Sequence, residues 1–213
     1  MSFTYTAHTG CCETRMNSLE SIEKGVLYGA PIVEFDLNFD ESGNPVLSHD
    51  KPQGGEVPLE EAFKKISGYE NLMVNVDAKT YVALHKVQSL ASDFGILDRI
   101  FFTGIGEDAV DVTRKTAPQV EYYLNMKVKF PLFHTNSYLE ALVKKVKECG
   151  AVGINFNHRN ASRKLVKFFH QNNLLVSIFT VDSEARMRKI LSYGADNITT
   201  RKPDVLQGII KEN

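Results

Sequence analysis

Val33-Glu34-Phe35-Asp36-Leu37 is a stretch in which apolar and acidic side chains alternate. Successive side chains of a β-strand point to opposite faces, so Glu34 and Asp36 share one face, and Val33, Phe35 and Leu37 share the other. At a rise of about 3.3 Å per residue, the two carboxylates are expected about 7 Å apart along the strand. The pattern predicts a strand with an apolar face packed against helices and a second face that carries two carboxylates.

Short apolar runs comparable to this one recur along the chain. Those typical of strands are residues 3–7, 32–37, 72–78, 99–103, 120–124, 152–155, 175–180 and 197–199. Segments with the apolar spacing of helices follow them: 19–27, from 58, 82–94, 107–116, 137–148, 163–171, 183–192 and from 204. Such alternation predicts parallel strands joined by helices, and eight strand–helix units are the number that closes into a (β/α)₈ TIM barrel. We expect a single α/β domain over residues 1–213.

The connection between the second and third strands is the irregular part of this pattern. A polar turn at residues 40–44 leads into a short apolar return at residues 45–49, which predicts a short insertion there. An open doubly wound sheet is the alternative fold. It would usually carry a glycine-rich turn after its first strand, and His8-Thr9-Gly10-Cys11-Cys12 is not such a turn.

Composition narrows the classes of partner. The chain has 25 basic and 26 acidic residues and a net charge of −1, so bulk electrostatics predict neither a nucleic-acid nor a membrane partner. No apolar stretch approaches membrane-spanning length, so we expect no stable membrane insertion. Three cysteines without regular spacing argue against a disulfide framework. The first residues lack the pattern of a signal peptide, and we expect a cytoplasmic location.

Chemistry in such a barrel is expected at the carboxyl ends of the strands. Glu34 and Asp36 lie there on the second strand, and Asp77 and Lys79 end the third. An isolated acidic pair is more often a salt-bridged rim position, but a third carboxylate beside it adds like charge that is costly to bury. One divalent cation, Mg²⁺ or Ca²⁺, would compensate that charge, since both prefer oxygen ligands. Lys79 is expected to hold a phosphate oxygen beside the cation.

Two histidines are candidates for proton transfer. His8 ends the first predicted strand and His49 follows the return run after the 40–44 turn. Imidazole titrates near neutrality, so one histidine can accept a proton while the other donates one. The remaining histidines lie on predicted helices or loops without evident partners, and we interpret them as structural.

The order and spacing of short motifs along nearly the whole chain resemble those of the glycerophosphodiester phosphodiesterase family. His8-Thr9-Gly10, Arg15-Met16-Asn17, Glu34-Phe35-Asp36 and His49-Asp50 are similar to its His-Arg-Gly, Pro-Glu-Asn, Glu-x-Asp and His-Asp motifs. Asp77-Ala78-Lys79 resembles its acidic-x-Lys strand. Phe179-Thr180, Gly194-Ala195-Asp196 and Thr200-Arg201-Lys202-Pro203 are similar to its C-terminal Trp-Thr, Gly-x-Asp and Thr-Asp-x-Pro motifs.

The resemblance implies a (β/α)₈ barrel that cleaves glycerophosphodiesters to glycerol phosphate and an alcohol with bound Mg²⁺ or Ca²⁺. It implies that His8 and His49 are acid and base, with either order open. It also implies metal ligation by Glu34, Asp36 and Asp77, and phosphate or substrate contacts by Lys79 and Asn17. A related barrel group, the phospholipase D toxins of spider venom, releases a cyclic phosphate instead, so both products stay open, as does the oligomeric state.

Three departures from the family pattern bear on function. Thr9 replaces an arginine that would grip phosphate, Met16 replaces a glutamate, and the segment between His49 and Asp77 is shorter than in many members. They motivate an alternative, a catalytically altered barrel that binds a phosphorylated ligand. A metal-dependent sugar isomerase is a third possibility, but it would need more carboxylates on later strands.

Overall fold

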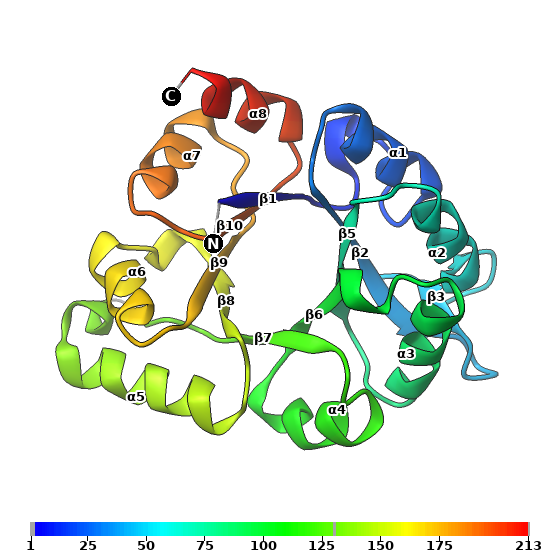
Figure 1. Cartoon of the computed structure of the whole chain (residues 1–213), viewed down its shortest axis with the longest axis horizontal. Coiled ribbons are helices and arrows are strands. Elements are labelled where there is room, and N and C mark those ends of the chain that lie inside the picture. The colour runs from blue at the N-terminus through cyan, green and yellow to red at the C-terminus, as the bar shows by residue number, and fades with distance from the viewer. Residues whose placement is uncertain (1–2, 130, 213) are drawn as a thin grey trace.

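The computed structural model describes residues 3–129 and 131–212. Eight parallel strands in this described part form a closed ring, in which β1 pairs with both β10 and β2. The ring order and bounds are β1 Thr4–Ala7, β2 Ile32–Phe39, β5 Met73–Ala78, β6 Ile100–Ile105, β7 Glu121–Asn125, β8 Gly153–Asn157, β9 Leu175–Phe179 and β10 Asn197–Thr200. Figure 1 looks down this barrel. The predicted TIM barrel is confirmed.

Helices surround the ring on its outer side (Figure 1). They are α1 Leu19–Leu27, α2 Leu59–Ser67, α3 Leu84–Asp93, α4 Val110–Thr116, α5 Asn136–Glu148, α6 Arg163–His170, α7 Glu184–Leu191 and α8 Pro203–Lys211. Short 3₁₀ turns span Cys11–Glu13, Leu97–Arg99, Glu107–Ala109, Leu132–His134 and His158–Asn160. The ring of Phe35 on β2 packs against Phe63 on α2 with centroids 6.3 Å apart. The apolar face of the alternating stretch therefore meets the helices, as predicted.

The insertion after β2 is a small antiparallel hairpin. β3 Pro45–Leu47 pairs with the end of β2, and β4 Val57–Pro58 pairs with β3. The short insertion is confirmed, but β4 is a strand that the sequence pattern does not predict. Leu27 is apolar and falls within the predicted helix, yet it is 70% exposed. It is the last residue of α1.

The interior of the barrel changes from apolar to polar along its axis. Near the amino ends of the strands, Ile32, Phe101 and Tyr123 form a small apolar cluster. Above it lie buried polar side chains, several of which hydrogen-bond to one another: Thr6 Oγ1 donates to Asn197 Oδ1 at 3.1 Å, and Asn197 Nδ2 donates to Ser177 Oγ at 3.1 Å. The candidate site lies directly above this polar layer.

No helix among the described residues is long and apolar enough to cross a membrane.

Candidate active site

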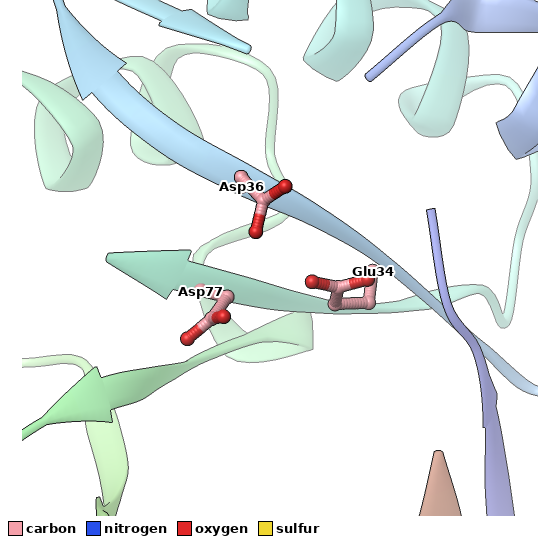
Figure 2. Close-up of side chains that lie close together, drawn as sticks. All are labelled: Glu34, Asp36 and Asp77. Atoms are coloured by element: carbon pink, nitrogen blue, oxygen red, sulfur yellow. The ribbon is translucent and has the colours of Figure 1, made fainter. Parts of the chain in front are cut away.

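Three carboxylates from two adjacent strands meet inside the barrel. Glu34 and Asp36 extend from β2 and Asp77 from β5, where Asp36 and Asp77 are register partners. One oxygen from each carboxylate lies within 4.8 Å of the others. Figure 2 shows the three side chains turned toward a common space. Glu34 is 4% exposed and Asp36 is 2% exposed, so the cluster is largely withdrawn from water.

Each carboxylate is held by a donor from a neighbouring element. The backbone N–H of Thr9 donates to Glu34 Oε2 at 2.7 Å, and Asn17 Nδ2 donates to Asp36 Oδ2 at 3.0 Å. Thr103 Oγ1 on β6 lies 3.1 Å from Asp77 Oδ1 and 2.8 Å from Asn75 Oδ1, two acceptors that share its single hydroxyl proton. The loop after β1 thus orients the acids of β2, and β6 orients the acid of β5. Such supporting contacts fix a ligand set in advance.

Lys79, which follows β5, supplies the positive charge within the cluster. Its Nζ lies 2.8 Å from Asp36 Oδ1 and 2.5 Å from Asp77 Oδ2. Burial alone would lower the pKa of Lys79, but the adjacent carboxylates of Asp77 and Asp36 outweigh burial and raise it. The lysine is therefore firmly cationic and lies beside the acids, as the sequence predicts.

The charge of the cluster is not balanced by this lysine. With all three acids ionised, one ammonium leaves two negative charges uncompensated in a buried position. Burial, followed by the nearby Asp36 and Asp77, raises the pKa of Glu34 well above its usual range. A hard divalent cation matches both the residual charge and the all-oxygen donor set. The residues present therefore fit a site for one such cation.

His8 lies at the carboxyl end of β1 and lines the same cavity. Its Nδ1 is 2.7 Å from the carbonyl oxygen of Thr9 and 3.6 Å from Glu34 Oε2. A carbonyl oxygen only accepts, so the Thr9 contact assigns the ring proton to Nδ1 and leaves Nε2 as the acceptor. Burial lowers the pKa of His8, and the positive charge of Arg201 adds to that effect. The neutral imidazole is thus favoured.

His49 occupies a different environment. It follows Ser48, whose N–H donates to the carbonyl of Asp36 at 3.0 Å, so it lies near the carboxyl end of β2. Its side chain is 59% exposed, and Nδ1 lies 2.9 Å from Asp50 Oδ1. His49 is not among the residues that line the cavity around the acids. The structure therefore brings His8, the three acids, Lys79 and Asn17 together, and leaves His49 at the rim.

The space above the acids is a cavity of about 350 Å³. The polar and aromatic side chains of its wall, most of which the sequence pattern does not indicate, are Asn75, Tyr81, Thr103, Asn125, Asn155, Phe179 and Thr199. Most of them lie within or at the end of a predicted strand, which is the signal that could have identified them. Neutral hydrogen-bonding groups thus line the cavity together with the charged ones.

One structural histidine does have a partner, contrary to expectation. His170 Nε2 lies 2.8 Å from Asp196 Oδ2, and the same oxygen accepts the backbone N–H of Val176. The two residues are distant in sequence, so no local pattern indicates the pair. His170 remains a structural residue, away from the cavity.

Comparison with known proteins identifies relatives of this barrel. The model of the glycerophosphoryl diester phosphodiesterase family matches residues 55–205. A Bacillus altitudinis glycerophosphodiester phosphodiesterase is 24% identical over 152 residues, which are 68% of this chain and 59% of that protein. The chain thus spans less than two thirds of the length of this curated relative. Asp77 and Lys79 lie inside the matched residues of the family model, whereas the other candidate site residues precede them.

Solved structures show the same fold. A Silicibacter pomeroyi DSS-3 structure, assigned as a glycerophosphoryl diester phosphodiesterase, has a TM-score of 0.83 at 16% identity and covers 99% of this chain and 94% of its own. An Oleispira antarctica phosphodiesterase in complex with the product sn-glycerol-3-phosphate has a TM-score of 0.80 at 17% identity, with 98% and 96% covered. Because the family model matches well over half of a chain with this barrel fold, the chain belongs to the glycerophosphoryl diester phosphodiesterase family.

Proposed function

We propose that this protein cleaves glycerophosphodiesters, or closely related phosphodiesters, with one divalent cation, Mg²⁺ or Ca²⁺, bound by Glu34, Asp36 and Asp77. The observation that carries the proposal is the convergence of these three acids, with oxygens within 4.8 Å, at the base of an open cavity. The products would be glycerol phosphate, or a cyclic phosphate, and an alcohol. The name of the Bacillus altitudinis relative and the product bound by the Oleispira antarctica enzyme support this substrate class.

The charged groups of the site would have different roles in binding the phosphate. A cation held by the three acids would neutralise charge on the phosphate and polarise it. Lys79 lies beside these acids with its ammonium group already oriented by Asp36 and Asp77. It would contact a phosphate oxygen through charge-assisted hydrogen bonds, which are stronger than neutral ones. Asn17 orients Asp36 by hydrogen bonds, and we propose that this is its principal contribution to substrate binding.

Proton transfer would use the two histidines. We assign His8 as the base, because its neutral form is favoured and its Nε2 is left to accept a proton from the attacking hydroxyl or water. His49 would then protonate the leaving alkoxide. Its Nδ1 donates to the Asp50 carboxylate, which fixes the ring and leaves Nε2 toward other groups. To act in this way His49 would carry a second proton on Nε2, give it to the alkoxide and regain it from solvent, to which 59% of the side chain is exposed.

A panel of phosphodiesters, incubated with Mg²⁺, Mn²⁺ or Ca²⁺ and followed by ³¹P NMR, tests this function. We expect a new resonance of glycerol phosphate or of a cyclic phosphate, and the spectrum separates the two. EDTA should prevent its appearance. Cleavage that proceeds at the full rate in EDTA would contradict the metal role, and no product from any diester would contradict the activity.

A second candidate is a barrel that binds a phosphorylated ligand without cleaving it. Two observations favour it. His49 lies at the rim of the cavity. Thr9 is 1% exposed and its Oγ1 accepts the N–H of Asn17, so the Thr9 side chain is not available to bind phosphate. In the ³¹P experiment this candidate predicts a perturbed ligand resonance without any product.

The three free cysteines agree with a reducing compartment, and we propose a cytoplasmic location.

A further inference from the structure

Asn125 lines the same cavity as the acidic site, on the strand two places around the ring from β5, which carries Asp77. It ends β7, and in the ring order β7 lies directly across from β1, the strand that carries His8. Asn125 lines the cavity and is half-buried. The cavity wall therefore carries the acids and Lys79 on β2 and β5, and a neutral amide at the end of β7, with β6 between β5 and β7.

The orientation of this amide is settled by its neighbours. The backbone N–H of Gly104 donates to Asn125 Oδ1 at 3.0 Å, and Asn155 Nδ2 donates to the same oxygen at 3.1 Å. A backbone N–H can only donate, so the oxygen of Asn125 must face Gly104 and its NH₂ group must face elsewhere. Nδ2 has no acceptor among the described residues, and it is not one of the buried unsatisfied atoms. It is a donor that remains open to the cavity.

The two groups that hold Asn125 are themselves fixed. Gly104 has φ +78°, and an added Cβ would lie 2.3 Å from the carbonyl oxygen of Ala78, so only glycine fits there. Asn155 is 4% exposed, and its Oδ1 is buried without a hydrogen-bond partner in the described part of the chain. Leaving a buried acceptor unpaired is costly. Asn155 Oδ1 and Asn125 Nδ2 are thus the two polar atoms of this amide pair that have no hydrogen-bond partner in the described part of the chain.

We propose that Asn125 Nδ2 donates a hydrogen bond to a hydroxyl oxygen of the glycerol part of the ligand, and so selects glycerol phosphates over plain alkyl phosphates. The proposal rests on the proposed function, which places the phosphate at the acids and Lys79. A ligand anchored there would have its remaining atoms in the cavity that Asn125 also lines. A neutral donor suits a neutral hydroxyl, since the phosphate charge would be met by the cation and by Lys79. A preoriented donor is effective because binding then requires little further ordering of its side chain.

Binding of sn-glycerol-3-phosphate and of propyl phosphate, each titrated calorimetrically in Mg²⁺, tests this role. The two ligands share a phosphate and a three-carbon chain and differ only in the hydroxyls. We expect the wild-type protein to bind the glycerol ligand about fivefold to tenfold more tightly, as for one neutral hydrogen bond. Asn125→Ala should bring this preference close to one while leaving the affinity for propyl phosphate nearly unchanged.

A second variant keeps the test valid if Asn125→Ala does not fold. Asn125→Asp keeps an oxygen for Gly104 and Asn155 but replaces the free donor with an acceptor, so it should also abolish the preference while the added charge weakens both ligands. Asn157→Ala, in the exposed asparagine that ends β8, is the matched control and should keep the wild-type preference.

The results separate this inference from the proposed function. A wild-type preference that persists in both Asn125 variants, or a wild-type protein that binds both ligands equally, overturns the role of Asn125. Binding of neither ligand contradicts both proposals. A preference that depends on Asn125, in a protein that cleaves no diester, supports this inference and contradicts only the catalytic part of the proposed function.

Discussion

Asn17 holds Asp36 at two points. Its Nδ2 donates to Asp36 Oδ2 and its Oδ1 accepts the backbone N–H of Asp36, both at 3.0 Å. The residue has φ +55°, a left-handed conformation that asparagine adopts more readily than most residues. The loop after β1 is thereby tied to the middle of β2. Both polar ends of the amide are committed to one residue of the acidic cluster.

Removing this amide should loosen the acidic cluster. We expect Asn17→Gly, which keeps the left-handed backbone accessible, to lower the free energy of unfolding by about 1–3 kcal/mol, because the N–H and carboxylate of Asp36 lose their partners. Cation affinity should fall about tenfold to hundredfold. Asn17→Ala adds backbone strain and should be less stable than Asn17→Gly. Thermal unfolding and cation titration measure both effects, and unchanged affinity in Asn17→Gly would show that Asp36 needs no such support.

Glu34 should make the metal-free protein sensitive to pH. Burial raises its pKa in the folded state above the ordinary 4.5, so the unfolded chain releases its proton first as pH rises. The contribution of Glu34 to stability therefore falls from about pH 4.5 upward until the folded-state pKa is passed. In EDTA, Glu34→Gln should remove this decline, and it should also remove the gain in Tm that a cation gives the wild type. A decline of equal size in Glu34→Gln would place its origin elsewhere.

His8 should set the acidic limb of the pH–rate profile. Burial, assisted by Arg201, lowers its pKa, so kcat/KM should stay high at neutral pH and fall only below the ordinary 6.5. Removing the nearby positive charge with Arg201→Gln should move this limb to higher pH. His8→Ala should lose about 10²–10⁴-fold in kcat. The same limb in His8→Ala as in the wild type would exclude His8 as the titrating base.

His49 offers a test with little structural risk. The side chain is 59% exposed, and that of its partner Asp50 is 93% exposed, so His49→Ala should leave Tm within about 1 °C. If His49 protonates the leaving alkoxide, the variant should be slow on diesters with alkyl leaving groups. It should recover much of its rate on a nitrophenyl diester, whose leaving group needs no proton. Equal losses on both substrates would argue for a different role.

The strand that carries the acids is predictable from sequence because strand geometry is local. Alternation in residues 33–37 places Glu34 and Asp36 on one face and Phe35 on the helix side, and the structure shows this arrangement. The count of eight strand–helix units likewise gives the barrel, since the closure number follows from strand tilt and side-chain size.

Other features depend on contacts between segments far apart in the chain. Asn155 meets Asn125 because β7 and β8 are neighbours in the ring, and His170 meets Asp196 across two units. Nothing in either local sequence specifies the partner. The two amide hydrogen bonds of Asn17 to Asp36 are of the same kind, and the family resemblance indicates the residue without the contact.

Titration of the metal-free protein with Mn²⁺ by calorimetry tests most directly whether Glu34, Asp36 and Asp77 hold one divalent cation. We expect one cation per chain for the wild type. Asp77→Asn should weaken its binding by at least about a hundredfold, since a carboxylate ligand is lost. Asp108→Asn, in an acid outside the cluster, is the control and should bind as the wild type does. Wild-type affinity in Asp77→Asn, or no saturable binding in the wild type, would contradict the metal site.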